Sequence, residues 1–552
     1  MVQPADLIIT DAHVYTVDRS APTAEAFAVA DGRLLAVGTA AEIDRYRGPE
    51  TVVHPLGGAF VMPGLVDAHN HHFHAGKADL FELTFSAEAS YADILQAVRE
   101  HAAGLGPEEW IIGSSWGSGL IGQISHEEAR RGLDEAAGGR PVILTDDSHH
   151  NRWVNTRALE LAGITATTPD PEGGEIIGDP DTGNPSGLLL EAAGLLVEEA
   201  VRKSHTLSPQ QYEQAVAHGV QMAHTYGITA FQDAATSLEA LQALKALDDR
   251  GDLRSWVVSS MTVNDQIFGY AEIGDALVWR GEEFRGRHHR PDFIKIFLDG
   301  TPPAHSGAFL HPYQPDTEHG DHFHGGTTMP PEELLDWLRR AAQAGISAKI
   351  HCTGDASVRV VLDAVQTLRT EGLTETKFQI AHGQFIDPAD LPRFAELGVT
   401  AEISPFLWFP GVIADALGTV RPAEEIQRLQ PNRSLIDSGA LVAGGSDWPV
   451  SESPNAWEGI HGLVTRTDPN QRREGRLAEQ EAITLPEAIE VFTINGARAM
   501  GVDDVTGSLV AGKSADFVVL DRDPFAEDPD QLVHTTVQQT WFAGEKVYAA
   551  DA

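Results

Sequence analysis

The segment Val61-Met62-Pro63-Gly64-Leu65-Val66-Asp67-Ala68-His69-Asn70-His71 joins a buried apolar run to a closing pair of histidines. Residues i and i+2 of a β-strand face the same side, so the imidazoles of His69 and His71 are expected to point into one space. Two convergent imidazoles provide half of a zinc site. His-x-His is a weak signal when taken alone, because surface histidines also produce it by chance.

Seven further runs of strand length follow this segment, and most of those after residue 227 are separated by stretches with helical spacing, such as 331–344 and 356–369. Strands that alternate with helices predict parallel βα units, and eight such strands predict an α/β fold with a closed (β/α)₈ barrel of the TIM type. The eight predicted strands are 59–71, 227–233, 256–262, 293–300, 347–354, 378–383, 399–405 and 441–447.

Both ends of the chain carry short strand-like runs, including an Asp31-Gly32 hairpin signal near the N-terminus. Neither set is large enough for an isolated sheet, so we expect residues 1–58 and 505–552 to form one β-sandwich together. The gap after the first barrel strand is too long for a βα connection. Residues 76–205 are therefore expected to form an inserted subdomain over the barrel mouth, which leaves 59–75 and 206–504 to the barrel.

The composition predicts a soluble globular protein, because 42% of the 552 residues are hydrophobic and 22% are charged. No run reaches the length of a membrane-spanning helix, and the first residues lack the features of a secretory signal. The one cysteine, Cys352, excludes an internal disulfide framework. A cytoplasmic location is therefore expected.

The formal net charge is −42, from 39 Lys and Arg against 81 Asp and Glu. Such a surface repels phosphate backbones and anionic lipids, which argues against nucleic-acid and membrane partners. A small-molecule substrate is the expected partner. The oligomeric state is left open, with a homodimer as one alternative.

Three more candidate residues end later strands. His351 and His382 close adjacent predicted strands, and Asp447 follows the last strand. Each histidine could be a core residue bonded to a carbonyl, but two at equivalent strand ends favour metal ligation. Asp447 could equally cap the next helix.

Lys295 lies inside the apolar strand Phe293-Ile294-Lys295-Ile296-Phe297-Leu298. A buried ammonium is costly unless it is paired. One interpretation is a salt bridge with an inward carboxylate. The other is a lysine of lowered pKa that has reacted with CO₂ to give a carbamate bridging two metals, because this reaction requires the neutral amine that burial favours.

The segment 61–71, together with His351, His382 and Asp447, resembles the metal-dependent amidohydrolase superfamily. Further phrases are similar to its family 3 branch, which includes N-substituted formamide deformylases, and the resemblance covers essentially the whole chain. These phrases are Lys295-Ile296-Phe297-Leu298-Asp299-Gly300, His351-Cys352-Thr353-Gly354-Asp355, Gly445-Ser446-Asp447-Trp448-Pro449, and the segments 149–159 and 493–499.

The resemblance implies a ligand set. His69 and His71 would bind the more buried metal with Asp447, while His351 and His382 would bind the second. Lys295, as a CO₂-derived carbamate, would bridge the two. Zinc is the expected ion, with one or two per chain.

The implied reaction is hydrolysis of a C–N bond in an amide, formamide or related group. The metal would supply hydroxide, and Asp447 would shuttle the proton to the leaving nitrogen. The second metal or a nearby imidazole would polarise the carbonyl group. Asp299 and Asp355 are candidates for orienting the ligand histidines.

Aromatic and imidazole side chains expected near the barrel mouth are candidates for substrate contact, although ordinary packing explains any single one as well. They are Trp116, His149, His150, Trp153, Phe309, His311, Trp408 and Trp448. Two other functions stay open. A one-metal deaminase or other hydrolase on the same fold would differ in metal stoichiometry. A non-enzymatic metal-binding protein would keep its function after Asp447→Asn.

Overall fold

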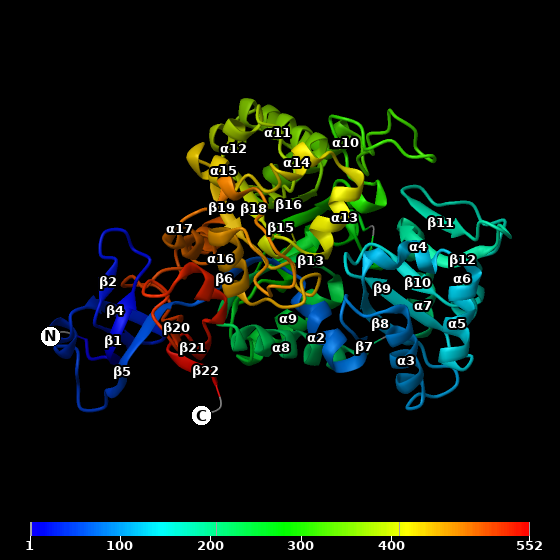
Figure 1. Cartoon of the computed structure of the whole chain (residues 1–552). Coiled ribbons are helices and arrows are strands. Elements are labelled where there is room, and N and C mark those ends of the chain that lie inside the picture. Colours follow the sequence, from blue (N-terminus) through cyan, green and yellow to red (C-terminus); the bar gives the residue numbers. More distant parts are fainter. Residues whose placement is uncertain (1–2, 206, 266, 408, 551–552) are drawn as a thin grey trace.

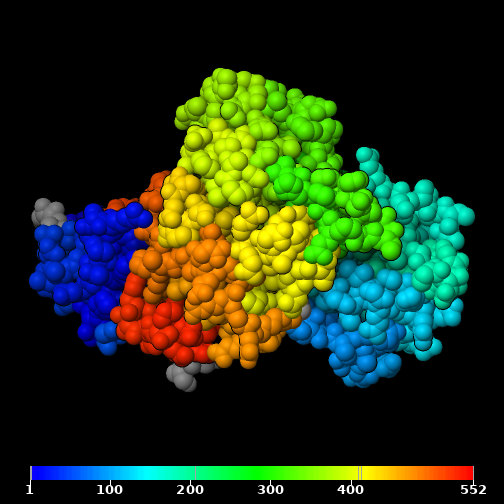
Figure 2. All heavy atoms as spheres, turned by 45° about the horizontal axis from the view of Figure 1, so that its top comes forward, coloured from blue at the N-terminus to red at the C-terminus, as the bar shows by residue number. Residues whose placement is uncertain are grey.

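The computed structural model describes residues 3–205, 207–265, 267–407 and 409–550. A central barrel is flanked at one end by a sheet built from both chain termini and at the other by an inserted subdomain (Figure 1). The space-filling view shows these two units at opposite ends of the molecule (Figure 2). Among the described helices, none combines the length and the apolar character needed to cross a membrane.

The barrel sheet has eight parallel strands, as predicted, in the order β19-β18-β17-β16-β15-β14-β13-β6. Backbone hydrogen bonds of the loop after β19 bring its two edges together: Asp447 N donates to His69 O, and His71 N donates to Trp448 O, both at 2.7 Å. The strands are β6 (Leu65–Asn70), β13 (Ile228–Thr236), β14 (Trp256–Thr262), β15 (His289–Phe297), β16 (Ser347–Cys352), β17 (Phe378–His382), β18 (Val399–Ile403) and β19 (Leu441–Gly444).

Helices connect most of these strands, and two of them match the stretches with helical spacing in the sequence. Between β14 and β15 the chain forms the 3₁₀ turns η3 (Gly274–Ala276) and η4 (Val278–Phe284) instead of an α-helix. The barrel helices are α8 (Pro209–Thr225), α9 (Leu238–Arg250), α10 (Pro331–Gln343), α11 (Asp355–Thr370), α12 (Leu391–Leu397), α13 (Val412–Val420), α14 (Ala423–Ile426), α15 (Asn432–Asp437), α16 (Ala456–Thr465), α17 (Leu485–Val491) and α18 (Ile494–Met500).

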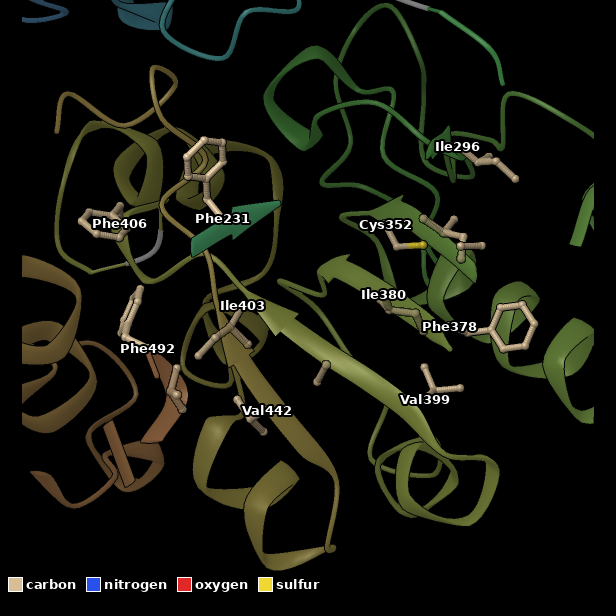
Figure 3. Close-up of a cluster of buried hydrophobic side chains, with 14 of the residues drawn as sticks. Phe231, Ile296, Cys352, Phe378, Ile380, Val399, Ile403, Phe406, Val442 and Phe492 are labelled. Carbon is tan, nitrogen blue, oxygen red and sulfur yellow. The ribbon is translucent and has the colours of Figure 1, made fainter. Parts of the chain in front are cut away.

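Side chains of the barrel strands alternate between two environments, as the two-residue period of a strand requires. One set joins the large apolar core, of which Figure 3 shows Ile380, Val399 and Ile403 on neighbouring strands. The alternating set lies inside the barrel and includes buried polar side chains beside apolar ones such as Val258 and Phe293. Lys349 of β16 demonstrates this, because its Nζ donates to the backbone oxygen of Ala68 across the interior at 2.9 Å.

The first predicted strand, 59–71, is divided in the structure. Residues up to Pro63 belong to β5 (Val52–Pro63) of the terminal sheet, and β6 begins the barrel at Leu65. Gly64 separates them, and a Cβ atom there would lie 2.1 Å from Thr229 Oγ1. The close approach of Thr229 therefore requires a glycine at the point where the chain passes from one sheet to the other.

Strands from both chain ends share the eight-stranded terminal sheet, in which β20 pairs antiparallel with β5. A two-layered sandwich and the predicted domain boundaries stay predictions. The elements of this unit are β1 (Leu7–Tyr15), β2 (Thr23–Ala24), β3 (Ala26–Ala30), β4 (Arg33–Gly38), α1 (Ala40–Asp44), β5, β20 (Phe517–Leu520), β21 (Val537–Phe542) and β22 (Glu545–Ala549).

A separate six-stranded sheet, ordered β11-β12-β10-β9-β8-β7, is inserted between β6 and β13. Its helices pack around a core of its own that includes Trp116 and Trp153. The elements are α2 (His72–Phe81), β7 (Leu83–Thr84), α3 (Tyr91–Ala102), β8 (Ile111–Trp116), α4 (Ile121–Ile124), α5 (Glu127–Ala137), β9 (Val142–Asp146), β10 (Arg152–Val154), α6 (Thr156–Ala162), β11 (Gly174–Gly178), β12 (Pro185–Glu191) and α7 (Leu195–Ser204).

Candidate metal centre

His69, His71 and Asp447 converge where the two edges of the barrel sheet meet. The Nε2 atoms of His69 and His71 lie 3.3 and 3.4 Å from Asp447 Oδ1. These separations are close to the edge of a tetrahedron built on metal–ligand bonds of about 2.0–2.1 Å. His69 Nε2 is buried and has no hydrogen-bond partner among the described residues. The donor set and the orphaned nitrogen therefore fit a divalent cation.

Glu402, on β18, orients His69 from behind. Its Oε2 lies 2.5 Å from His69 Nδ1 and also accepts from Lys349 Nζ at 3.2 Å. Burial raises the pKa of Glu402 to about 7, and the Lys349 ammonium opposes that shift. A carboxylate at Nδ1 requires the proton to be on that nitrogen, so the lone pair of the neutral imidazole lies at Nε2.

His351 and His382 lie beside this group, at the ends of adjacent strands. The ring centroid of His382 is 4.8 Å from that of His69 and 4.7 Å from that of His351. His382 Nδ1 lies 3.9 Å from Asp447 Oδ2. The backbone of His382 is left-handed, with φ of 69°, and its carbonyl accepts from Gln430 Nε2 at 2.6 Å. The structure thus brings all four predicted imidazoles into one cavity.

Lys295 lines the same cavity and is fully buried. Burial and the neighbouring Lys349 ammonium lower the pKa of Lys295 to about 7. Its Nζ lies 4.6 Å from the ring centroid of Phe297. Within the described part of the chain no carboxylate lies within ion-pair distance of this nitrogen, so the salt-bridge interpretation lacks a partner.

The two aspartates considered as orienting groups have different surroundings. Asp299 Oδ1 lies 3.6 Å from His351 Nε2 and accepts from the backbone of Thr353 at 2.9 Å. Burial raises the pKa of Asp299 to about 6. Asp355 instead accepts from the backbone N–H of Leu310 at 2.8 Å. Only Asp299 therefore lies near a predicted ligand.

A larger second cavity opens from the metal cavity past His150, His351 and Asp447. Its lining is mainly apolar and, within the described residues, includes no Lys or Arg. Asp147 is a carboxylate on its wall, and burial raises the pKa of Asp147 to about 7. The apolar and small lining side chains are Ile121, Pro302, Pro303, Ala304, Leu407, Ile413, Ala416, Leu417 and Val450.

The predicted substrate-contact residues are dispersed. His149 and His150 line the metal cavity. Trp116 and Trp153 are buried in the core of the insertion. Phe309 packs against Arg421, whose guanidinium carbon lies 3.8 Å from the centroid of the phenylalanine ring. His311 is exposed. Trp448 is buried, and its backbone carbonyl accepts the hydrogen bond from His71 N. Trp408 lies outside the described residues. Of those among them that the structure describes, only the two histidines line either cavity described above.

A second group of possible ligands, His305, Asp316 and His319, lies on the loop after β15. His319 Nδ1 lies 2.9 Å and His305 Nε2 3.2 Å from the same oxygen of Asp316. Hydrogen bonding to His319 helps to lower the pKa of Asp316 to about 2. The imidazoles thus already have a carboxylate partner, and we assign no metal to this group.

Sequence reasoning missed Lys349, Glu402 and Glu191. The first two were detectable, because a charged residue inside an apolar strand is the signal that identified Lys295. Glu191 carries a similar signal, because it is the one charged residue in the apolar run 187–197.

The sequence matches the amidohydrolase family over residues 53–548, and the chain belongs to this family. It is 30% identical to the N-substituted formamide deformylase of Arthrobacter pascens, over 99% of this chain and 98% of that protein. It is 28% identical to the putative amidohydrolase YtcJ of Bacillus subtilis, over 97% and 98% of the two chains. The fold is similar to that of an uncharacterized metal-dependent hydrolase from Pyrococcus horikoshii, with a TM-score of 0.73 at 21% identity, covering 95% of this chain and 99% of that one.

Proposed function

We propose that this chain is a metal-dependent hydrolase that cleaves the C–N bond of an amide, formamide or related group. The observation that carries the proposal is the Asp447 carboxylate facing two imidazole Nε2 atoms in a buried cavity that adjoins an apolar pocket. Membership of the amidohydrolase family and the likeness to a formamide deformylase support the type of bond.

The proposed ligands divide between two ions. His69, His71 and Asp447 would hold one, and His351 and His382 would hold the other. Lys295 would bridge them as a carbamate, which the lowered pKa of its amine favours. Zinc suits the imidazole-rich donor set.

The proposed chemistry gives Asp447 the main task. A divalent cation held by His69, His71 and Asp447 would lower the pKa of water toward about 7 and so would supply hydroxide at neutral pH. Asp447 accepts the proton that the attacking water loses, since its carboxylate lines the cavity and faces the Nε2 atoms of His69 and His71. As the water oxygen bonds to the carbonyl carbon and the C–N bond breaks, Asp447 returns this proton to the leaving nitrogen. The products are a carboxylic acid and an amine.

A one-metal hydrolase or deaminase is the second candidate, and one observation favours it. His69, His71 and Asp447 form a group with all ligand atoms within 4.8 Å of one another, which His351 and His382 do not join. Metal analysis distinguishes the two candidates. Two ions per chain would support the two-metal enzyme, and one ion with full activity would support the alternative.

The test is a screen of N-formyl and N-acyl amines with the zinc-loaded full chain, following amine release. We expect hydrolysis of at least one substrate class and a loss of about 10³-fold or more in kcat for Asp447→Asn, because proton transfer contributes about 10²–10⁴-fold. The exposed Asp504 provides a matched control in Asp504→Asn. Absence of amine release across the panel, or retained activity in Asp447→Asn, would overturn the proposal.

A further inference from the structure

His150 reaches the metal cavity from the insertion and not from the barrel. It follows β9, its side chain is buried, and it lines both the metal cavity and the apolar pocket. Its ring centroid is 5.6 Å from that of His351. A substrate that extends from the pocket to Asp447 would therefore pass this imidazole.

Glu191, at the end of β12, holds one nitrogen of that ring. The Nδ1–H of His150 donates to Glu191 Oε2 at 2.6 Å. In the described part of the chain, the other ring nitrogen, Nε2, has no hydrogen-bond partner. Because a carboxylate can only accept, Nδ1 carries a proton and the ring orientation is fixed. Nε2 is thus the nitrogen left for a ligand.

Glu191 also ties the insertion to the barrel. Its Oε1 accepts from Ser306 Oγ and, at 3.3 Å, from the backbone N–H of Thr301, both on the loop after β15. Its backbone has a positive φ of 50° with ψ of −129°, a conformation that costs free energy for any residue with a Cβ. Such outliers persist where surrounding contacts fix them and are common in functional sites. Glu191 therefore links His150 to the loop that follows the strand carrying Lys295.

We propose that His150 is a catalytic residue that acts as a doubly protonated imidazolium: its Nδ1–H donates to Glu191, the positioning residue, and its Nε2–H donates to the carbonyl oxygen of the scissile group. This inference rests on the proposed function. As the water oxygen adds to the carbonyl carbon, negative charge develops on the carbonyl oxygen, and a donor fixed there stabilises it. His150 keeps both ring protons throughout, because Asp447 alone transfers the proton between water and nitrogen. The insertion would thus complete the active site.

The first test replaces the imidazole. In His150→Asn we expect kcat/KM for the best substrate of the panel to fall about 10²–10³-fold, the usual effect of removing one oxyanion donor. Bound metal per chain and Tm should stay at wild-type values. The control is His126→Ala, since His126 is an exposed histidine of the same subdomain, 3.8 Å from Asp179.

The second test separates positioning from general structural support by a double-mutant cycle. Glu191→Gln should lower kcat/KM in the wild-type background and have little further effect in His150→Asn, because Glu191 acts through that ring. Additive losses would overturn the positioning role. Should Glu191→Gln fail to fold, Ser306→Ala loosens the same carboxylate and should show the same dependence on His150.

The outcomes separate this inference from the proposed function. A metal-loaded wild type that is inactive on the whole panel contradicts the proposed function. If the wild type is active and kcat/KM of His150→Asn stays within about threefold of the wild-type value, the inference is overturned, because a lost oxyanion donor should cost about 10²-fold. Loss of metal in His150→Asn would also overturn it, because His150 would then act as a metal ligand.

Discussion

The Nδ1 atom of His69 lies 2.5 Å from Glu402 Oε2, and this buried contact connects one edge of the barrel to a strand near the other. Lys349 donates to the same oxygen from β16 at 3.2 Å. The three side chains form a charged network beneath the metal cavity, and none of them is exposed to solvent. Its effect is to fix the His69 tautomer and to direct the lone pair of Nε2 toward Asp447.

Glu402→Gln tests this network. The amide keeps the size of the side chain but removes the charge that holds the proton on Nδ1, so we expect metal affinity to fall about 10–100-fold. Competition with a fluorescent chelator measures the affinity. Glu396→Gln, at an exposed position on α12, is the matched control. Unchanged affinity in Glu402→Gln would show that His69 needs no such partner.

Lys295→Ala tests the proposed carbamate. Removal of the bridging group should release one ion per chain and lower kcat by at least about 10²-fold, because the water would lose a metal that acidifies it. Short carboxylic acids should restore part of the lost metal and part of the lost kcat, since they can occupy the space of the carbamate. Lys203→Ala, at an exposed lysine of α7, is the control. Bare ammonium in the mass spectrum of metal-loaded protein would refute the carbamate.

Formation of the carbamate should depend on pH. The pKa of Lys295 is lowered to about 7, so the ammonium predominates below that pH and the neutral amine above it. Only the neutral amine reacts with CO₂. At a fixed partial pressure of CO₂, the labelled carbamate signal in carbon NMR should therefore increase as the pH rises from about 6 to about 8. A signal that stays constant or decreases over this interval would contradict the lowered pKa.

The barrel was predictable because its strands are buried on both faces and its helices are amphipathic, so each βα unit leaves a local pattern. His351 and His382 were predictable for the same reason, since they end such strands. The orientation of Glu402 toward His69 was not predictable, because it depends on closure of the barrel between strands far apart in sequence. The division of the first strand at Gly64 was also missed, since the close approach of Thr229 is a tertiary contact.

The contribution of the insertion was harder to predict than that of the barrel. His149 and His150 are adjacent in the sequence, yet only His150 has a carboxylate partner, Glu191, which lies on another strand. Trp116 and Trp153 were predicted to contact substrate but lie in the core of the insertion, because large aromatic side chains often fill a core. Composition alone cannot separate these two roles.

The apolar pocket predicts a preference for uncharged substrates. Its lining has no Lys or Arg within the described residues, Asp147 forms part of its wall, and the chain carries a net charge of −42. A carboxylate on the substrate would lose its hydration without gaining a Lys or Arg partner. We therefore expect kcat/KM for an N-acyl amine with an apolar substituent to exceed that of a carboxylate-bearing analogue of equal size by at least about tenfold.

Ile121→Arg tests the electrostatic origin of this preference, because Ile121 lies on the wall of the pocket in the insertion. The new guanidinium should raise kcat/KM for the carboxylate-bearing analogue and lower it for the apolar substrate, so that the ratio between them falls about tenfold or more. Leu161→Arg, at an exposed position of the same subdomain, adds the same charge away from the pocket and should leave the ratio unchanged. An equal change of the ratio in both variants would mean that overall charge, and not the pocket, selects the substrate.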